Sequence, residues 1–226
     1  GNWAKESAGA VFITATKDVT ISDDREGGNL CSFVNNSVNN SETDTTGNGG
    51  AIEVARYGAG TVSGCEFSNN LALKGNGGVA SADGRDVVLT FDRSSFQSNI
   101  AKYGGCFYLS IRAQMTVSHS FAVNNKAIFD GGVFYENEES SLIWLHTESV
   151  GNSASRSGGV GFANDASALM ISLSTFRRNS ASFYGGVLYL THVKSPTPGG
   201  IGFTKVVHVK HSSLIENAAK QGGSVY

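Results

Sequence analysis

The chain has 226 residues, of which 40% are hydrophobic and only 16% are charged, and its formal net charge is −2. A nearly neutral chain gives no electrostatic basis for binding nucleic acid or an acidic membrane surface. No apolar run approaches the roughly 20 residues that a membrane-spanning helix needs, and the length suits one substantial core.

The chain is built from a repeat of about 27 residues. The copies share a Gly-Gly pair, which begins at Gly49, Gly77, Gly104, Gly131, Gly158, Gly185 and Gly222, so the spacings are 28, 27, 27, 27, 27 and 37 residues. An Asn-x-Ala element recurs with it, at Asn70, Asn99, Asn125, Asn152, Asn179 and Asn217. Asn36 opens a further copy, in which Val38 replaces the alanine. Recurrence at such a period indicates a repeat architecture.

Short β-branched or aromatic runs lie between each Gly-Gly pair and the next asparagine. In chain order they include Asp86–Phe91, Met115–Ser118, Leu169–Ser174 and Lys205–Lys210. Such runs are typical of strands. Two or three short strands per period fit one coil of a parallel β-helix, with coils about 4.8 Å apart. We therefore predict an all-β fold, a right-handed parallel β-helix of about eight coils, with residues 1–226 forming a single domain.

In this fold, equivalent residues of successive coils lie above one another. The glycines supply a turn with positive φ, and the asparagine column predicts a ladder of side-chain amides that satisfies buried polar groups. The alanine column predicts a tight corner. A phenylalanine often stands three residues before the asparagine, at Phe33, Phe67, Phe96 and Phe176. We expect these rings to stack in the interior, each contributing about 1.5–3 kcal/mol on burial.

Two segments do not fit the period, and we expect them to be loops. They are Ser37–Thr46 and Lys194–Gly202, and the second contains both prolines of the chain. Proline cannot donate a hydrogen bond within a sheet, so it belongs outside the strands. Either loop carries function, or both are tolerated surface insertions.

Modification sites are predicted near the N-terminus. Cys31 and Cys65 take equivalent places in neighbouring copies, so they form a disulfide or remain two small buried thiols. Cys106 has no partner in register. Asn35 and Asn39 begin N-glycosylation sequons, which matter only if the protein passes through a eukaryotic secretory pathway.

The strand after each Gly-Gly pair predicts a candidate binding face. Alternation places the second and fourth residues inward, as at Ile52 and Val54, although Glu136 breaks the apolar pattern once. The outward third residues begin with Glu53 and Ser81 and continue as Tyr108, Tyr135, Phe162, Tyr189 and Tyr226. We expect these five aromatic residues to form an external stripe that binds a ligand or another copy. The alternatives are ordinary stacking that supports the sheet, or a shift by one residue that places the rings in the core.

No cofactor, metal site or catalytic residue is predicted. His119, His146 and His211 share a column, but no carboxylate or cysteine repeats beside them. We therefore expect a solvated or stacked histidine face rather than metal ligands. The acidic residues do not share a column, and no catalytic motif is present.

The repeat resembles that of chlamydial polymorphic membrane proteins, which pair F-x-x-N with G-G-A-I. The motifs here are Phe33-Val-Asn-Asn36, Phe67-Ser-Asn-Asn70, Phe96-Gln-Ser-Asn99, Phe176-Arg-Arg-Asn179 and Gly49-Gly50-Ala51-Ile52. The resemblance covers the chain from about residue 31 to its end. It implies a surface-displayed parallel β-helix passenger with a role in adhesion, and it identifies no catalytic residue.

These observations predict a structural or adhesive extracellular repeat domain, a rigid rod that presents a repeated surface at the cell surface or in a filament. The expected partners are neighbouring copies, other extracellular proteins or glycans, and not nucleic acid. The alternative is a carbohydrate-active domain like the pectin lyases, because such enzymes also use this fold. The chain has no initial methionine or signal peptide and stops just after a Gly-Gly pair. Since an uncapped solenoid end exposes strand edges, we expect a segment of a larger protein.

Overall fold

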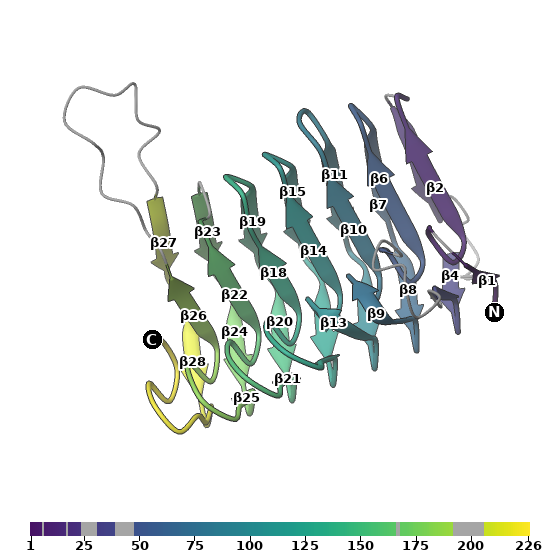
Figure 1. Ribbon diagram of the computed structural model, residues 1–226. Helices are drawn as coiled ribbons and strands as arrows, with labels where there is room; N and C mark the ends of the chain where they lie inside the picture. Colours follow the sequence, from purple (N-terminus) through teal and green to yellow (C-terminus); the bar gives the residue numbers. More distant parts are fainter. Residues whose placement is uncertain (6, 17, 24–30, 39–47, 166–167, 192–205) are drawn as a thin grey trace.

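The computed structural model describes residues 1–226 except 6, 17, 24–30, 39–47, 166–167 and 192–205. The predicted loop Lys194–Gly202 and most of Ser37–Thr46 therefore lie outside the described residues. The described chain forms four seven-stranded parallel sheets and contains no helix. Figure 1 shows the coils stacked side by side, with the two termini at opposite ends of the stack.

Sheet A consists of short strands that each begin directly after an asparagine of the repeat. In spatial order they are β1 (Trp3–Ala4), β5 (Ser37–Val38), β9 (Leu71–Asn76), β13 (Ile100–Tyr103), β17 (Lys126–Ala127), β21 (Ser153–Ala154) and β25 (Ser180–Ala181). The repeated alanines are in register here, and Ala72, Ala101 and Ala127 are completely buried.

Sheet B consists of the strands that follow the Gly-Gly pairs. They are β2 (Val11–Thr14), β6 (Ile52–Ala55), β10 (Ala80–Asp83), β14 (Phe107–Ser110), β18 (Phe134–Glu136), β22 (Gly161–Asn164) and β26 (Leu188–Thr191). The predicted alternation is present, because Ile52 and Val54 are completely buried. Glu136 also points inward and is completely buried, in register with Leu109 and Ala163.

Sheet C contains the β-branched runs that the sequence identified as strands. It is formed by β3 (Val19–Ser22), β7 (Ala59–Ser63), β11 (Val88–Asp92), β15 (Gln114–Ser118), β19 (Ser141–Leu145), β23 (Ala168–Ser172) and β27 (Val206–Lys210). Its inward residues include Leu89, Phe91 and Trp144, all of them completely buried.

Sheet D carries the phenylalanine column and completes each coil. It is formed by β4 (Cys31–Val34), β8 (Cys65–Ser68), β12 (Ser95–Gln97), β16 (Phe121–Val123), β20 (Glu148–Val150), β24 (Thr175–Arg177) and β28 (Ser213–Ile215). The Phe33 and Phe67 rings stack with centroids 4.8 Å apart, and Phe67 stacks on Phe96 at 5.5 Å. Phe121, one place earlier in its copy, points outward and is exposed.

The prediction of an all-β parallel solenoid with a period of about 27 residues is confirmed. Each coil visits sheets A, B, C and D in turn, so it has four strands where two or three were expected. The difference lies in sheet A, whose two-residue strands are too short to recognise from a hydrophobic pattern. The right-handed sense of the coil stays a prediction.

The asparagines form a continuous ladder at the corner between sheets D and A. Asn99 is representative: its Nδ2 donates to Oδ1 of Asn125 at 3.0 Å and to the Phe67 carbonyl at 3.0 Å, and its backbone N–H donates to the same Oδ1 at 2.9 Å. The same bonds continue through Asn152 and Asn179 to Asn217. Because the amides from Asn70 to Asn179 are buried, these rungs satisfy donors and acceptors that water cannot reach.

Both glycines of each pair before the last are required, for different reasons. The first adopts positive φ, as at Gly131 with φ 70°. The second has an ordinary φ, but a Cβ on Gly132 would overlap the carbonyl oxygen of Gly159 in the next coil. The pair therefore provides both a turn and close contact between coils.

Candidate functional site

The predicted aromatic stripe lies on the outer face of sheet B, but it is not freely exposed. Tyr108, Tyr135 and Tyr189 are half-buried, Phe162 is only 9% exposed, and Tyr226 is the exposed member at 51%. The five residues therefore occupy the outward positions, but most of their surface is covered. The cause is a second group of side chains from the corner between sheets A and B, which packs over the stripe: the Tyr103 ring lies 5.1 Å from Tyr135, and Tyr184 lies 5.5 Å from Tyr189.

The rings of the stripe stack on one another along the solenoid axis. Tyr108 and Tyr135 have centroids 5.6 Å apart at an interplanar angle of 15°, and Tyr135 and Phe162 are 4.9 Å apart at 4°. The stack continues from Phe162 to Tyr189 and from Tyr189 to Tyr226. Since the ring faces cover one another, the stripe presents edges and hydroxyl groups to a ligand rather than broad aromatic faces.

The side chains that cover the stripe come from the two positions before each Gly-Gly pair. The position next to the pair holds Tyr103, Asp130, Ser157, Tyr184 and Gln221 in successive coils, which we call the corner column. The position before it holds Lys102, Phe129, Arg156, Phe183 and Lys220. These residues are not among the predicted site residues. The available signal was the recurrence of tyrosine directly before the glycines at positions 103 and 184.

A cavity of about 390 Å³ opens where the corner column lacks rings. Asp130 and Ser157 stand there between Tyr103 and Tyr184, and they leave the space that an aromatic side chain occupies elsewhere in the column. The lining residues are Asp130, Tyr135, Arg156, Ser157, Phe162, Asn164, Phe183, Tyr184, Tyr189 and Thr191. We call this space the groove pocket.

One ion pair forms a wall of the groove pocket. The Arg156 guanidinium pairs with the Asp130 carboxylate through Nη2, and its Nε donates to Oδ2 at 3.1 Å. Asp130 is buried and also accepts the Ser157 backbone N–H at 3.0 Å, whereas the Arg156 side chain is 51% exposed. Arg156 also lies over the Phe129 ring, with its Cζ 5.0 Å from the centroid. These contacts hold the guanidinium in place with part of it open to solvent.

The groove pocket is electrically balanced. The hydrogen bond with Asp130 raises the pKa of Arg156, so the arginine stays charged and its charge is matched by the carboxylate. Burial, followed by the influence of Tyr108 and Asp130, raises the pKa of Tyr135 and keeps its hydroxyl protonated. The pocket therefore offers hydroxyl, amide and guanidinium groups with no net charge.

A second, acidic group lies at the other end of the stripe. Burial raises the pKa of Glu53 to about 7, although Oε2 accepts the Ala8 N–H at 3.4 Å. Burial and then the charge of Glu138 raise the pKa of Asp83, which in turn contributes to the raised pKa of Tyr108. Sequence analysis found no shared column of acids. The fold nevertheless brings these residues together from different positions of the repeat.

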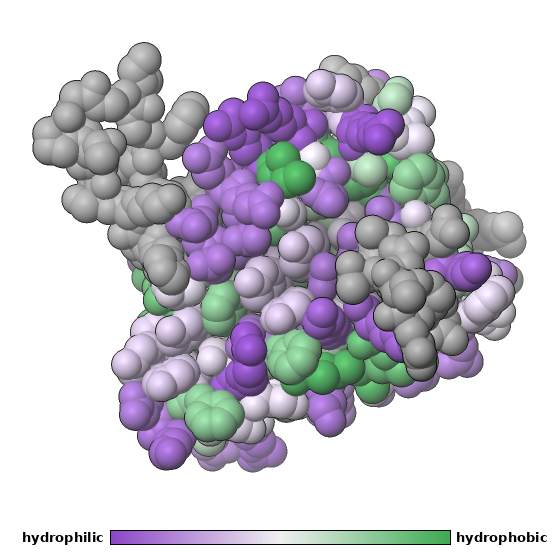
Figure 2. Space-filling model, in the orientation of Figure 1, coloured by the Kyte–Doolittle hydropathy of each residue, from purple (hydrophilic) through white to green (hydrophobic). Residues whose placement is uncertain are grey.

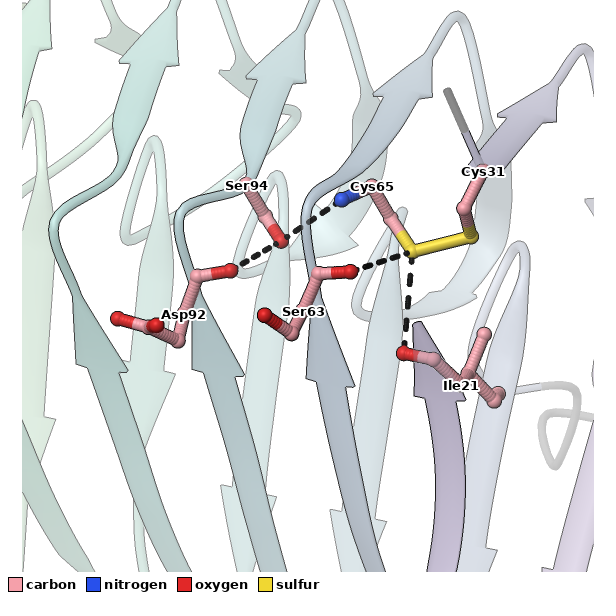
Figure 3. Close-up of a disulfide and its surroundings, with 6 residues drawn as sticks. All are labelled: Ile21, Cys31, Ser63, Cys65, Asp92 and Ser94. Atoms are coloured by element: carbon pink, nitrogen blue, oxygen red, sulfur yellow. Dashed lines mark hydrogen bonds between the residues drawn. A yellow bond between two sulfur atoms is a disulfide. The ribbon is translucent and has the colours of Figure 1, made fainter. Parts of the chain in front are cut away.

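The two N-terminal cysteines form a disulfide between neighbouring strands of sheet D (Figure 3). Their Cα atoms lie 4.5 Å apart, as the register Cys31↔Cys65 requires. The Cys65 backbone N–H donates to Oγ of Ser94 at 3.3 Å, which ties the bridge to the next coil. Cys106 is buried and free, and burial raises the pKa of its thiol well above the usual value.

The sequons lie at the edge of the described structure. Asn35 is exposed, with φ 56°, at the corner that leads into sheet A. Asn39 lies outside the described residues. Only the first sequon therefore has a known position, on an accessible corner of the solenoid.

The histidines occupy the corner between sheets C and D. His119, His146 and His211 are exposed and all adopt positive φ, and the first two rings stack 5.0 Å apart. His119 Nδ1 lies 3.0 Å from Oδ1 of Asp92. Desolvation opposes ionisation of Asp92, but hydrogen bonds from His119 and Ser118 lower its pKa. The described residues contain no group of three or more potential metal ligands.

Within the described part of the chain, no helix is long and apolar enough to span a membrane. On the face shown in Figure 2, hydrophobic side chains form separate patches among polar ones. Comparison with protein-family models, curated proteins and solved structures finds no match for the chain. What the structure shows is therefore the fold alone, a parallel β-solenoid with a period of about 27 residues.

Proposed function

We propose that the chain is an adhesive repeat domain of an extracellular or cell-surface protein, a rigid rod whose sheet-B face binds a ligand. The observation that carries this proposal is the groove pocket beside the stacked rings. On sheet C, the central outward column instead runs from Thr61, Thr90 and Thr116 to Ile143, Met170 and His208, without aromatic rings other than the histidine. An aromatic hollow with convergent polar groups is typical of binding sites, and such a mixed column of single side chains is not.

Two further observations support this proposal. The disulfide Cys31–Cys65 is of the kind that persists in oxidising compartments, which fits secretion. The F-x-x-N and G-G-A-I motifs support kinship with the chlamydial polymorphic membrane proteins, whose passengers are displayed at the surface. Ligand binding is favoured over self-assembly through the stripe, because the ring faces that would join two copies are already stacked within one chain.

The test is surface binding by fluorescently labelled protein. The wild type is applied to immobilised extracellular-matrix proteins and glycans, beside a Phe183→Ala, Tyr184→Ala double variant that removes one wall of the groove pocket. Phe121→Ala is the matched control, because it removes an exposed ring from sheet D. We expect the double variant to lose binding and the control to retain it. Equal binding by all three proteins, or no binding by any, would overturn the proposal.

Sedimentation velocity of the same proteins tests the filament alternative. Large species formed by the wild type and lost in the double variant would show that the face joins copies of the chain rather than a separate ligand. We expect the wild type to remain monomeric, since its stacked rings leave little apolar face to bury.

A second candidate is a carbohydrate-active enzyme domain, favoured by the acidic group at the end of the stripe. A carboxyl with a pKa of about 7 beside another carboxyl is suited to general acid catalysis, and Glu53 stands beside Asp83 in this way. Release of reducing ends or unsaturated products from neutral and acidic polysaccharides, abolished by Glu53→Gln, would establish this activity. We expect no turnover by either protein.

A further inference from the structure

The geometry of the groove pocket points to a specific ligand class. We propose that it holds one uncharged pyranose unit of a glycan, placed between Tyr184 and the Asp130–Arg156 pair. This inference rests on the proposed function, because it names the ligand of the same face. Its basis is the shape, the hydrogen-bonding groups and the charge of the pocket.

The shape follows from an interruption in the corner column. Tyr103 and Tyr184 are three coils apart, which corresponds to about 14 Å at the usual spacing of strands. The intervening Asp130 is turned toward Arg156 and Ser157 is small, so a space stays open beside the Tyr184 ring, although it does not extend to Tyr103. Its volume of about 390 Å³ falls in the range of roughly 300–1,000 Å³ that is usual for small-molecule pockets.

One aromatic wall remains available for stacking. Phe183, Tyr189 and Tyr226 contact the Tyr184 ring, but its neighbour toward the N-terminal end of the column is Ser157. Ser157 is too small to cover the ring, so that side of Tyr184 lines the cavity. The C–H face of a pyranose packs on such a ring, whereas the stripe beneath offers only edges.

The polar groups suit hydroxyl groups. Asp130 binds Arg156 through its Nε and Nη2, and the described residues give the Arg156 Nη1 no hydrogen-bond partner. Those N–H groups belong to an exposed side chain and can donate to sugar oxygens, and Asn164, Thr191 and three tyrosines also line the pocket.

The charge balance selects an uncharged unit over an acidic one. The single cation of the pocket is already paired with a carboxylate that is 1% exposed. An incoming carboxylate would have to compete with Asp130 or lie close to it, and like charges at short range are unfavourable. A neutral unit meets no such cost.

The experiment uses methyl glycosides as probes. Saturation-transfer NMR measures binding of the methyl α- and β-glycosides of glucose, galactose, mannose and N-acetylglucosamine, and of methyl glucuronide, to the whole chain at millimolar probe concentrations. Ser157→Tyr fills the interruption with a side chain that the same column already carries at positions 103 and 184. Thr116→Tyr adds the same side chain to the outer face of sheet C and serves as the control.

We expect at least one neutral glycoside to bind the wild type and Thr116→Tyr, and to bind Ser157→Tyr at least tenfold more weakly. Absence of glycoside binding, unchanged binding by Ser157→Tyr, or glucuronide bound tenfold more tightly than any neutral probe would overturn the inference. If matrix proteins still bind in a manner that needs Phe183 and Tyr184 while no glycoside does, the pocket takes a protein side chain, and only the proposed function survives. If nothing binds on either surface, both proposals fail.

Discussion

Two corners of the same coil differ in how strictly their residues repeat along the solenoid. At the corner between sheets D and A, every complete copy of the repeat places an asparagine, and the rungs are equivalent from Asn70 to Asn179. At the corner between sheets A and B, the two residues before the glycines are Gly-Asn in the first two copies and then change from coil to coil. The first corner is buried and satisfies the backbone, whereas the second combines buried residues such as Asp130 with exposed side chains such as Arg156 and forms the groove pocket. This contrast indicates that repetition provides stability, and we propose that departures from repetition provide the binding site.

The largest expected effect is a change at the glycines that hold the coils together. Gly132→Ala places a methyl group on the carbonyl oxygen of Gly159, and neither backbone can move without breaking sheet hydrogen bonds. We expect a loss of more than about 4 kcal/mol, since a backbone overlap cannot be relieved by a side-chain rotation. Urea unfolding followed by circular dichroism measures it. Ser155→Ala, at an exposed position of the same corner, should change stability by less than about 0.5 kcal/mol.

The next effect concerns one rung of the ladder. Asn125→Ala removes the acceptor of two Asn99 donors and the donor to Asn152 and to the Phe96 carbonyl. Leaving such buried groups unsatisfied should cost about 3–4 kcal/mol. The neighbouring Lys126→Ala, at an exposed position, is the control. A melting temperature equal for both variants would show that the ladder is not a source of stability.

The disulfide should contribute a similar or slightly smaller amount. Its cysteines are 34 residues apart, and closing a loop of this size stabilises a protein by about 2–4 kcal/mol. We expect dithiothreitol to lower the urea midpoint of the wild type and to leave a Cys31→Ser, Cys65→Ser variant unaffected. Three free thiols in protein purified without reductant would contradict both the bridge and the secreted location that it supports.

Glu53 makes stability depend on pH. Its pKa is about 7 in the folded chain against an ordinary value of 4.5, so the folded state binds more protons than the unfolded state between these values. Stability should therefore fall as the pH rises from 4.5 to 7, by up to about 3 kcal/mol, and then level off. Glu53→Gln should reduce this slope strongly. A wild-type profile that rises across the same window would contradict the burial of this carboxyl.

The smallest expected change in stability belongs to the corner that varies. Ser157→Tyr introduces a residue type that the column already accepts, so the free energy of unfolding should change by less than about 1 kcal/mol. Thermal unfolding beside the wild type checks this. A large loss would mean that the interruption at Ser157 is needed for folding, and the contrast between the two corners would then disappear.

Strict repetition explains what the sequence could predict. The Gly-Gly turns, the asparagine column and the register of Cys31 with Cys65 all follow from aligning the repeated motifs, although the two cysteines are 34 residues apart. The inward positions of sheet B followed from alternation, and Tyr108 and its equivalents do lie on the outer face.

The remaining features depend on side chains that do not repeat. Tyr135 is half-buried because the Tyr103 ring of the preceding coil packs against it. The repeated motifs do not predict this contact. Glu53 and Asp83 occupy different positions of the repeat, so the columns of equivalent residues do not show that the two carboxyls interact. The groove pocket exists because Asp130 and Ser157 are not aromatic, and such a gap becomes visible only when the coils are stacked.

The most direct test compares binding by one variant from each corner. Labelled Asn125→Ala and Ser157→Tyr are applied to the immobilised matrix proteins and glycans at a temperature where circular dichroism shows both to be folded. We expect Asn125→Ala to bind as the wild type does and Ser157→Tyr not to bind. Binding retained by Ser157→Tyr, or lost by folded Asn125→Ala, would contradict the assignment of binding to the corner where the repeat varies.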